Sequence, residues 1–216
     1  MTRREANKGI LSMAAAVVMA PGVAVAEVGQ LPPPTKTGGK PLIDALQLRH
    51  STREFSERSL PPQVLSDLLW AAFGINRPAS GDRTAPYWRH IMVIDVYAVM
   101  ADGVWFYDPK SHSLVRQLQA DIRPKTGLQD FVATAPLNLV YVAHGERMQD
   151  ISAEDRRLYA SVDTAFIGQN VYLYCASEGL GSVFRGAVDL KGLAKAMQLG
   201  PDLFVTFAQT VGYPKS

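Results

Sequence analysis

The pattern of hydrophobic and polar positions predicts helices that alternate with buried strands. Apolar residues recur at helical spacing in two short segments, 41–48 and 62–73, and Gly74 follows the second one as a stop signal. Continuous apolar runs that are typical of strands buried in a sheet occur at 91–100, 137–143 and 203–211. Helical and strand patterns therefore share one chain.

The longest helical pattern begins after Ser152, which predicts an N-cap, and continues to Glu178. Its apolar positions are Leu158, Val162, Ala165, Phe166, Ile167, Val171, Leu173 and Tyr174. They cover most of the helix circumference, which predicts a central helix or one shared with a second subunit. Three polar residues in the same pattern, Asp163, Gln169 and Asn170, need partners if they are buried, and we interpret them as forming structural hydrogen bonds across an interface.

Shorter elements surround these segments. Residues 103–107 and 113–115 predict a hairpin whose turn carries His112 as a surface residue. A short helix is expected at 124–131, and Asp189 is expected to cap a helix that continues through Met197. Residues 27–40 contain three consecutive prolines and a Gly-Gly pair, which indicates an extended arm or linker.

Composition and charge narrow the class of protein. The 216 residues suit one domain, and 47% hydrophobic with 19% charged residues is typical of a globular chain. The first 26 residues carry three of the 22 basic residues and one of the 20 acidic ones, so the remainder is neutral. No excess of basic residues is left to bind nucleic acid, and that class of partner is excluded.

Residues 1–26 have the composition of a targeting signal. Arg3 and Arg4 precede the apolar run 10–20, and Ala24-Val25-Ala26 is a small-x-small cleavage site. The paired arginines resemble a twin-arginine export signal, which predicts an exported, periplasmic protein. A membrane anchor is the alternative, but the apolar run is shorter than the ~20 residues that span a bilayer. The lone Cys175 cannot form an internal disulfide and is expected in the core.

The strongest chemical signal is the segment Arg49-His50-Ser51-Thr52-Arg53-Glu54-Phe55. Its two arginines are four residues apart, with two hydroxyl side chains between them. A guanidinium is planar and permanently charged, so this spacing suits a phosphate or the anionic edge of a ring. The alternative is a pair of solvated charges at a helix end.

The letters R-H-S-T-R-x-F resemble the N-terminal FMN-binding signature of the nitroreductase-like flavoproteins. The resemblance implies that Arg49 holds the flavin phosphate, that Ser51 with its neighbour His50 holds phosphate and ribityl oxygens, and that Arg53 lies near the N1/O2 edge. A cation there would stabilise the charge that develops on reduction. The segments 179–186 and 212–214 also match the family.

The same resemblance implies further site residues and a fold. Arg185 and Gly186 are expected beside flavin N5, with Lys215 as a basic ligand of the phosphate. The implied fold is α+β, with a mixed, mainly antiparallel sheet surrounded by helices and a long central helix at a dimer interface, over residues 41–216. FMN would lie at that interface, lined by residues of both subunits.

One loop departs from the pattern of the subgroup that the chain resembles most, the SagB-type dehydrogenases. That subgroup usually reads T-A-P-S-x-x-N-x-Q, whereas this chain has Thr84-Ala85-Pro86 followed by residues 87–92. Tyr87, His90 and Met92 fill the Ser, Asn and Gln positions. His90 can replace the asparagine as a donor or acceptor to the flavin ring, but a methionine cannot replace the glutamine.

Absent motifs remove other classes of enzyme. The four histidines (50, 90, 112 and 144) have no close metal-ligand spacing, so no metal site is predicted, and His144 is expected in a loop. No G-x-S-x-G, P-loop or H-E-x-x-H sequence occurs.

The combined prediction is an FMN-dependent oxidoreductase that transfers two electrons by a ping-pong scheme, from NAD(P)H or another donor to a small-molecule substrate, as a homodimer. No side chain stands out as a catalytic acid. SagB-type relatives oxidise azoline rings in modified peptides, and export argues against that substrate. The alternatives are a non-catalytic flavin-binding protein, a degenerate dimeric binding module, and a flavin-free periplasmic binding protein.

Overall fold

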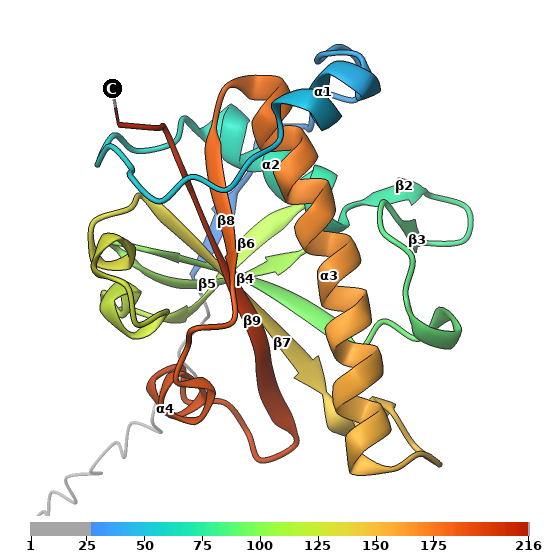
Figure 1. The fold of residues 1–216 in the computed structure, drawn as a ribbon. Coiled ribbons are helices and arrows are strands. Elements are labelled where there is room, and N and C mark those ends of the chain that lie inside the picture. Colours follow the sequence, from blue (N-terminus) through green and yellow to red (C-terminus); the bar gives the residue numbers. More distant parts are fainter. Residues whose placement is uncertain (1–26, 216) are drawn as a thin grey trace, which may run out of the picture.

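A seven-stranded sheet forms the centre of the computed structural model, which describes residues 27–215. The strand order is β1-β6-β5-β4-β7-β9-β8, and each neighbouring pair is antiparallel (Figure 1). The strands are β1 (Val28–Gln30), β4 (Ile94–Met100), β5 (Gly103–Asp108), β6 (Ser113–Leu118), β7 (Leu137–His144), β8 (Gly181–Arg185) and β9 (Leu203–Gly212). A separate hairpin joins β2 (Ile75–Arg77) to β3 (Asp82–Arg83). The predicted α+β fold is confirmed.

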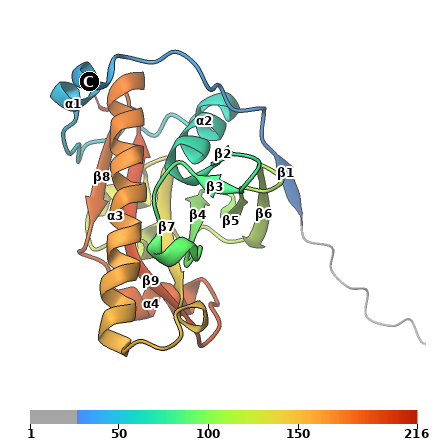
Figure 2. The same ribbon diagram turned by 90° about the vertical axis from the view of Figure 1, so that its right-hand side faces the viewer.

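Helices cover both faces of the sheet (Figures 1 and 2). The α-helices are α1 (Leu42–Leu48), α2 (Pro62–Phe73), α3 (Ala153–Glu178) and α4 (Leu190–Ala196). Leu68 and Leu69 of α2 and Ile167 of α3 pack with inward residues of β4, β5 and β7 in one hydrophobic cluster. On the opposite face, Leu193 of α4 packs with other residues of β4, β7 and β9. The domain therefore has a helix–sheet–helix arrangement.

The long helix has the boundaries that its caps predict. The Ser152 side chain accepts a hydrogen bond from the Asp155 amide at the N-terminus, and Gly179 adopts a left-handed conformation with φ 69° after the last turn. One side of α3 is buried against the sheet. Leu158, Val162 and Phe166 remain 55%, 40% and 45% exposed, so α3 also presents an apolar surface.

The central strands agree with the sequence pattern better than the peripheral ones. β7 is buried at all eight positions, because it pairs with β4 on one side and β9 on the other. β4 begins at Ile94 rather than at the predicted residue 91, because a 3-10 turn, η1 (Trp88–His90), precedes it. The single helix expected at 124–131 is replaced by two 3-10 turns, η2 (Arg123–Lys125) and η3 (Asp130–Ala133).

Three local predictions were wrong because the partners lie far away in sequence. The arm 27–40 is not wholly a linker, since β1 pairs with β6. His112 is not a free surface residue: its ring nitrogens lie 2.9 Å from the Tyr107 hydroxyl and 2.7 Å from Ser66 Oγ. His144 ends β7 rather than lying in a loop, and its Nε2 lies 2.6 Å from Asp95 Oδ2.

Two further findings concern export and membranes. The predicted signal segment 1–26 lies outside the described residues. Within residues 27–215, every helix is too short or too polar to cross a bilayer.

Candidate functional site

The arginine-containing segment is held by backbone hydrogen bonds to two other parts of the chain. α1 ends at Leu48, and the following segment runs extended. The Thr52 amide donates to the Ser182 carbonyl of β8 at 2.9 Å, and the Lys215 amide donates to the Glu54 carbonyl at 3.1 Å. The fold thus places segment 49–55 beside β8 and the C-terminal residues 213–215, which the sequence had singled out separately.

Tyr172 of α3 fixes the middle of this segment. Its hydroxyl accepts a hydrogen bond from the Phe184 amide at 2.8 Å and shares a second one, also 2.8 Å, with Ser51 Oγ. The guanidinium of Arg49 lies over the Tyr172 ring, 5.3 Å from its centroid, which is cation–π distance. Sequence reasoning missed Tyr172, because a tyrosine in an apolar helix pattern carries no signal of such a role.

Close packing between Thr52 and Gly181 fixes the segment further. A Cβ on Gly181 would lie 2.8 Å from Thr52 Cγ2, so only glycine allows this approach. Thr52 Oγ1 is buried and has no hydrogen-bond partner in the described part of the chain. A buried hydroxyl without a partner is uncommon, and it lies here inside the candidate site.

Three cations in this region are not neutralised. Arg53 and Lys215 are exposed and Arg49 is half-buried. Among residues 27–215, no carboxylate lies within 4 Å of any of the three side-chain charges. The site therefore has the charge to bind an anion such as a phosphate.

Arg185 does not face this site with its side chain, which corrects part of the prediction. The side chain is buried and donates to the Thr126 carbonyl (2.7 Å), Asn138 Oδ1 (3.1 Å) and Thr210 Oγ1 (3.1 Å). Burial lowers its pKa to about 10. What this segment offers a ligand is its backbone: Gly186 is exposed, and its amide donates to no acceptor within residues 27–215.

The loop 84–92, which departs from the family pattern, has its own set of contacts. The Tyr87 hydroxyl donates to Asp82 Oδ1 at 2.5 Å, and this hydrogen bond is the main cause that lowers the pKa of Asp82 to about 2. The Trp88 amide donates to Asp163 Oδ2 at 2.9 Å, and burial raises the pKa of Asp163 to about 6. Asp163 thus finds its partner within its own chain. The loop is held to α3 through this hydrogen bond.

His90 and Met92 have different surroundings in this loop. His90 is exposed and has a positive φ of 57°, which a histidine rarely adopts. Met92 Sδ accepts from Arg83 Nη2 at 3.0 Å. The loop lies on the other side of α3 from the segment that follows α1 (Figure 1).

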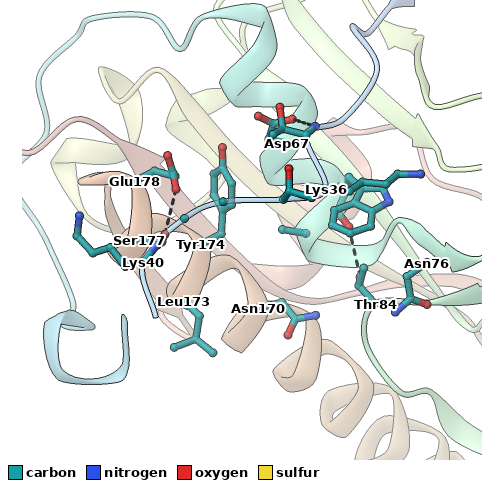
Figure 3. Close-up of a pocket in the computed structure, with 16 residues that line it drawn as sticks. Lys36, Lys40, Asp67, Asn76, Thr84, Asn170, Leu173, Tyr174, Ser177 and Glu178 are labelled. Carbon is teal, nitrogen blue, oxygen red and sulfur yellow. Dashed lines mark hydrogen bonds between the residues drawn. The ribbon is translucent and has the colours of Figure 1, made fainter. Parts of the chain in front are cut away.

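Two cavities adjoin these elements. One of about 340 Å³ is lined by His50, Tyr172 and Ser182 together with apolar side chains such as Leu180, so it borders the arginine segment. Another, of about 530 Å³, lies between residues 35–40, α2 and α3 (Figure 3) and contains none of the predicted site residues. Within residues 27–215, no three acidic, histidine or cysteine side chains are grouped so as to hold a metal ion.

Comparisons with known proteins identify the family of this chain. The model of the nitroreductase family matches residues 46–213. A candidate nitroreductase of Methanocaldococcus jannaschii is 34% identical over 157 residues, which are 68% of this chain and 78% of that protein. The crystal structure of a candidate nitroreductase of Ralstonia eutropha has 46% sequence identity and a TM-score of 0.84, and the match covers 88% of this chain and 90% of that one.

A more distant structure shares the fold. The NADPH:FMN oxidoreductase of Vibrio harveyi, solved with NAD⁺, superposes with a TM-score of 0.59 at 20% identity. That match covers 81% of this chain and 69% of the other.

Proposed function

This chain belongs to the nitroreductase family of oxidoreductases, and on that premise we propose that it is an FMN-dependent enzyme of the SagB-type subgroup. The observation that carries the proposal is the arrangement of segment 49–55. The fold holds this segment between α3, β8 and the C-terminal residues, with three cations that have no carboxylate within 4 Å in the described part of the chain.

The residues of this region fit the chemistry of FMN. Arg49 and Lys215 would bind the phosphate, with Ser51 and His50 as neighbouring hydrogen-bonding groups. His50 uses Nδ1 to contact the Leu48 carbonyl at 2.8 Å, which leaves Nε2 for a ligand. Arg53 would lie at the N1/O2 edge of the ring, and the free amide of Gly186 would donate to the ring near N5. Each assigned group is a donor or cation that faces an acceptor or anion.

When bound, FMN supplies two-electron transfer. The chain's part is to bind and orient the ring and to stabilise negative charge with Arg53. We propose a ping-pong scheme in which NAD(P)H, or another donor, and a small-molecule acceptor occupy the same site in turn. The likeness of the fold to the Vibrio harveyi enzyme supports such a donor. We assign no side chain of the described site as a general acid, and propose that the substrate or water supplies protons.

A homodimer completes the proposed site. The exposed apolar side chains Leu158, Val162 and Phe166 of α3 would form the interface. Because the loop that carries His90 lies beyond α3 from segment 49–55, we propose that this loop approaches the flavin bound to the second copy (Figure 1). The leader-like residues 1–26 support export to the periplasm as a further part of the proposal.

A non-catalytic flavin-binding protein is the second candidate, and one observation favours it. Met92 stands where the subgroup has a glutamine, and its sulfur is occupied by Arg83 at 3.0 Å. A thioether cannot donate a hydrogen bond to a flavin, so this chain has lost one contact with the ring.

The first experiment is the visible spectrum of the protein produced with its own leader, together with identification of any acid-released chromophore. Stoichiometric FMN is expected, and its reduction by NADPH or NADH followed by reoxidation would support an enzyme. FMN that binds but is never reduced by any donor would favour the non-catalytic reading. A colourless protein that does not take up added FMN would overturn both.

A further inference from the structure

Arg83 is a buried cation without a partner anion. Its side chain belongs to β3, and the residue is 6% exposed. Its nitrogens donate to Met92 Sδ at 3.0 and 3.3 Å and to the Phe73 carbonyl at 3.4 Å. Within residues 27–215, no carboxylate lies within 4 Å of it. Sulfur is a weak acceptor and 3.4 Å is a long hydrogen bond, so these hydrogen bonds compensate the charge only weakly. The guanidinium also lies over the Phe73 ring, 5.3 Å from its centroid.

A cavity of about 480 Å³ opens beside this guanidinium. Phe73 and Phe106 supply aromatic walls, and Lys110 and Arg147 add two more cations to the lining. Burying a charge is unfavourable unless an opposite charge and hydrogen bonds compensate for it. A buried guanidinium that borders an open cavity is therefore positioned to receive an anion from solution.

The acidic residues of the cavity already have other partners. Asp95 Oδ2 lies 2.6 Å from His144 Nε2, and Asp95 Oδ1 lies 3.9 Å from Arg147. Asp108 accepts hydrogen bonds from Ser111 Oγ at 2.6 Å and from the Lys110 amide at 2.9 Å. The charges that remain without a carboxylate within 4 Å, among the described residues, are those of Arg83 and Lys110.

We propose that this cavity binds the carboxylate group of a small ligand with an apolar body. The planar guanidinium fork of Arg83 matches a carboxylate in a bidentate arrangement, and Lys110 adds a second positive charge. The aromatic side chains Phe73 and Phe106 suit a flat or aliphatic body, as in other small-molecule sites with few polar groups.

The cavity is separate from the segments proposed to bind FMN within one chain, although Met92 of the loop 84–92 is part of its lining. None of its lining residues belongs to segments 49–55, 181–187 or 213–215. The inference therefore does not rest on FMN binding, and it can be tested in protein with or without flavin.

The test is a calorimetric titration of the full chain with benzoate. The comparison ligands are benzamide, which is a neutral isostere of benzoate, and inorganic phosphate. Saturable binding of benzoate is expected, with affinity at least tenfold higher than for benzamide or phosphate. Arg83→Met is expected to lower the affinity for benzoate at least tenfold. Lys191→Gln is the control, because Lys191 is an exposed cation outside the cavity, and the affinity of this variant for benzoate should stay within twofold of the wild type.

A second set of measurements tests the proposal if Arg83→Met folds poorly. Lys110 is exposed on a turn, so the Lys110→Gln variant should fold normally. Its affinity for benzoate should be severalfold lower than that of the wild type. NMR of protein labelled at the methionine methyl groups gives a further measurement, and the Met92 signal is assigned with the Met92→Leu variant. Benzoate should shift this signal, because Met92 contacts Arg83. Equal binding of benzoate and benzamide, a preference for phosphate, or an unshifted Met92 signal would overturn the proposal.

Discussion

The hydroxyl of Tyr172 lies 2.8 Å from Ser51 Oγ, although the two residues are 121 positions apart in the sequence. The same hydroxyl accepts from the Phe184 amide, so one side chain of α3 connects the arginine segment to β8. Through this contact the long helix determines where the candidate ligands Arg49 and Ser51 lie.

Removal of this hydroxyl tests whether it positions the segment. Tyr172→Phe keeps the aromatic ring under Arg49, but the Phe184 amide loses its acceptor. We expect the free energy of unfolding to fall by about 1–3 kcal/mol, the usual effect of an unsatisfied buried group. FMN affinity should fall severalfold in flavin fluorescence titrations. Tyr159→Phe is the control on the same helix, since the Tyr159 hydroxyl has no hydrogen-bond partner within residues 27–215, and it should change neither quantity.

The two arginines of the motif should bind the cofactor rather than stabilise the fold. Arg49→Ala combined with Arg53→Ala is expected to reduce FMN content at least tenfold, because charge-assisted hydrogen bonds to phosphate and to the ring edge are lost. Since Arg53 is exposed and Arg49 is only half-buried, the protein should remain folded by circular dichroism. Arg77→Ala, an exposed arginine elsewhere, serves as the control. Unchanged flavin content in the double variant would contradict the site assignment.

Gly181 should be required for the position of Thr52. A Cβ at this residue would lie 2.8 Å from Thr52 Cγ2 and 2.9 Å from Thr52 Cβ, so Gly181→Ala must displace the segment. We expect destabilisation of about 1–3 kcal/mol, as in other overpacked sites, together with weaker FMN binding. Gly200→Ala is the matched control, because a Cβ there meets nothing within 4 Å and should be tolerated. Equal flavin affinity in the two variants would argue against this contact.

Asp163 should make stability depend on pH. Burial raises its pKa from 3.8 to about 6 in the folded protein. Between pH 4 and pH 6 the unfolded chain therefore loses this proton first, and the native state binds more protons. The contribution of Asp163 to the free energy of unfolding therefore falls as pH rises through that window, by up to about 3 kcal/mol.

Asp163→Asn is expected to remove that dependence while its side-chain oxygen still accepts from the Trp88 amide. Urea unfolding at a series of pH values, monitored by tryptophan fluorescence, measures the effect. A wild-type stability that rises between pH 4 and pH 6 as steeply as that of the variant would contradict the prediction.

The side chain of Arg185 should stabilise the fold rather than bind the cofactor. Arg185→Ala would leave the Thr126 carbonyl and the Asn138 and Thr210 oxygens without their buried donor. We expect a loss of about 2–4 kcal/mol in the free energy of unfolding, measured with urea. Lys191→Ala, at an exposed position of α4, should change it by less than about 0.5 kcal/mol. A variant that is stable but lacks flavin would reverse this interpretation.

Local patterns predicted the parts of the fold whose causes are local. The caps of α3 at Ser152 and Gly179 follow from side-chain and backbone chemistry within a few residues. The burial of β7 follows from its continuous apolar run. The predictions for His112 and His144 were wrong, because their partners Ser66 and Asp95 come from other elements.

By itself, the sequence determined the α+β class, the order of the main helices and strands, and the arginine motif that resembles a flavin-binding signature. Those features depend on the spacing of apolar residues and on the chemistry of neighbouring side chains, which a linear sequence displays. The tertiary structure alone decided that Arg185 is buried, that Tyr172 holds Ser51, and that Arg83 borders a cavity with no carboxylate within 4 Å of it among residues 27–215. Each of these depends on contacts between elements that are distant in sequence, where packing of the whole domain decides which side chains meet.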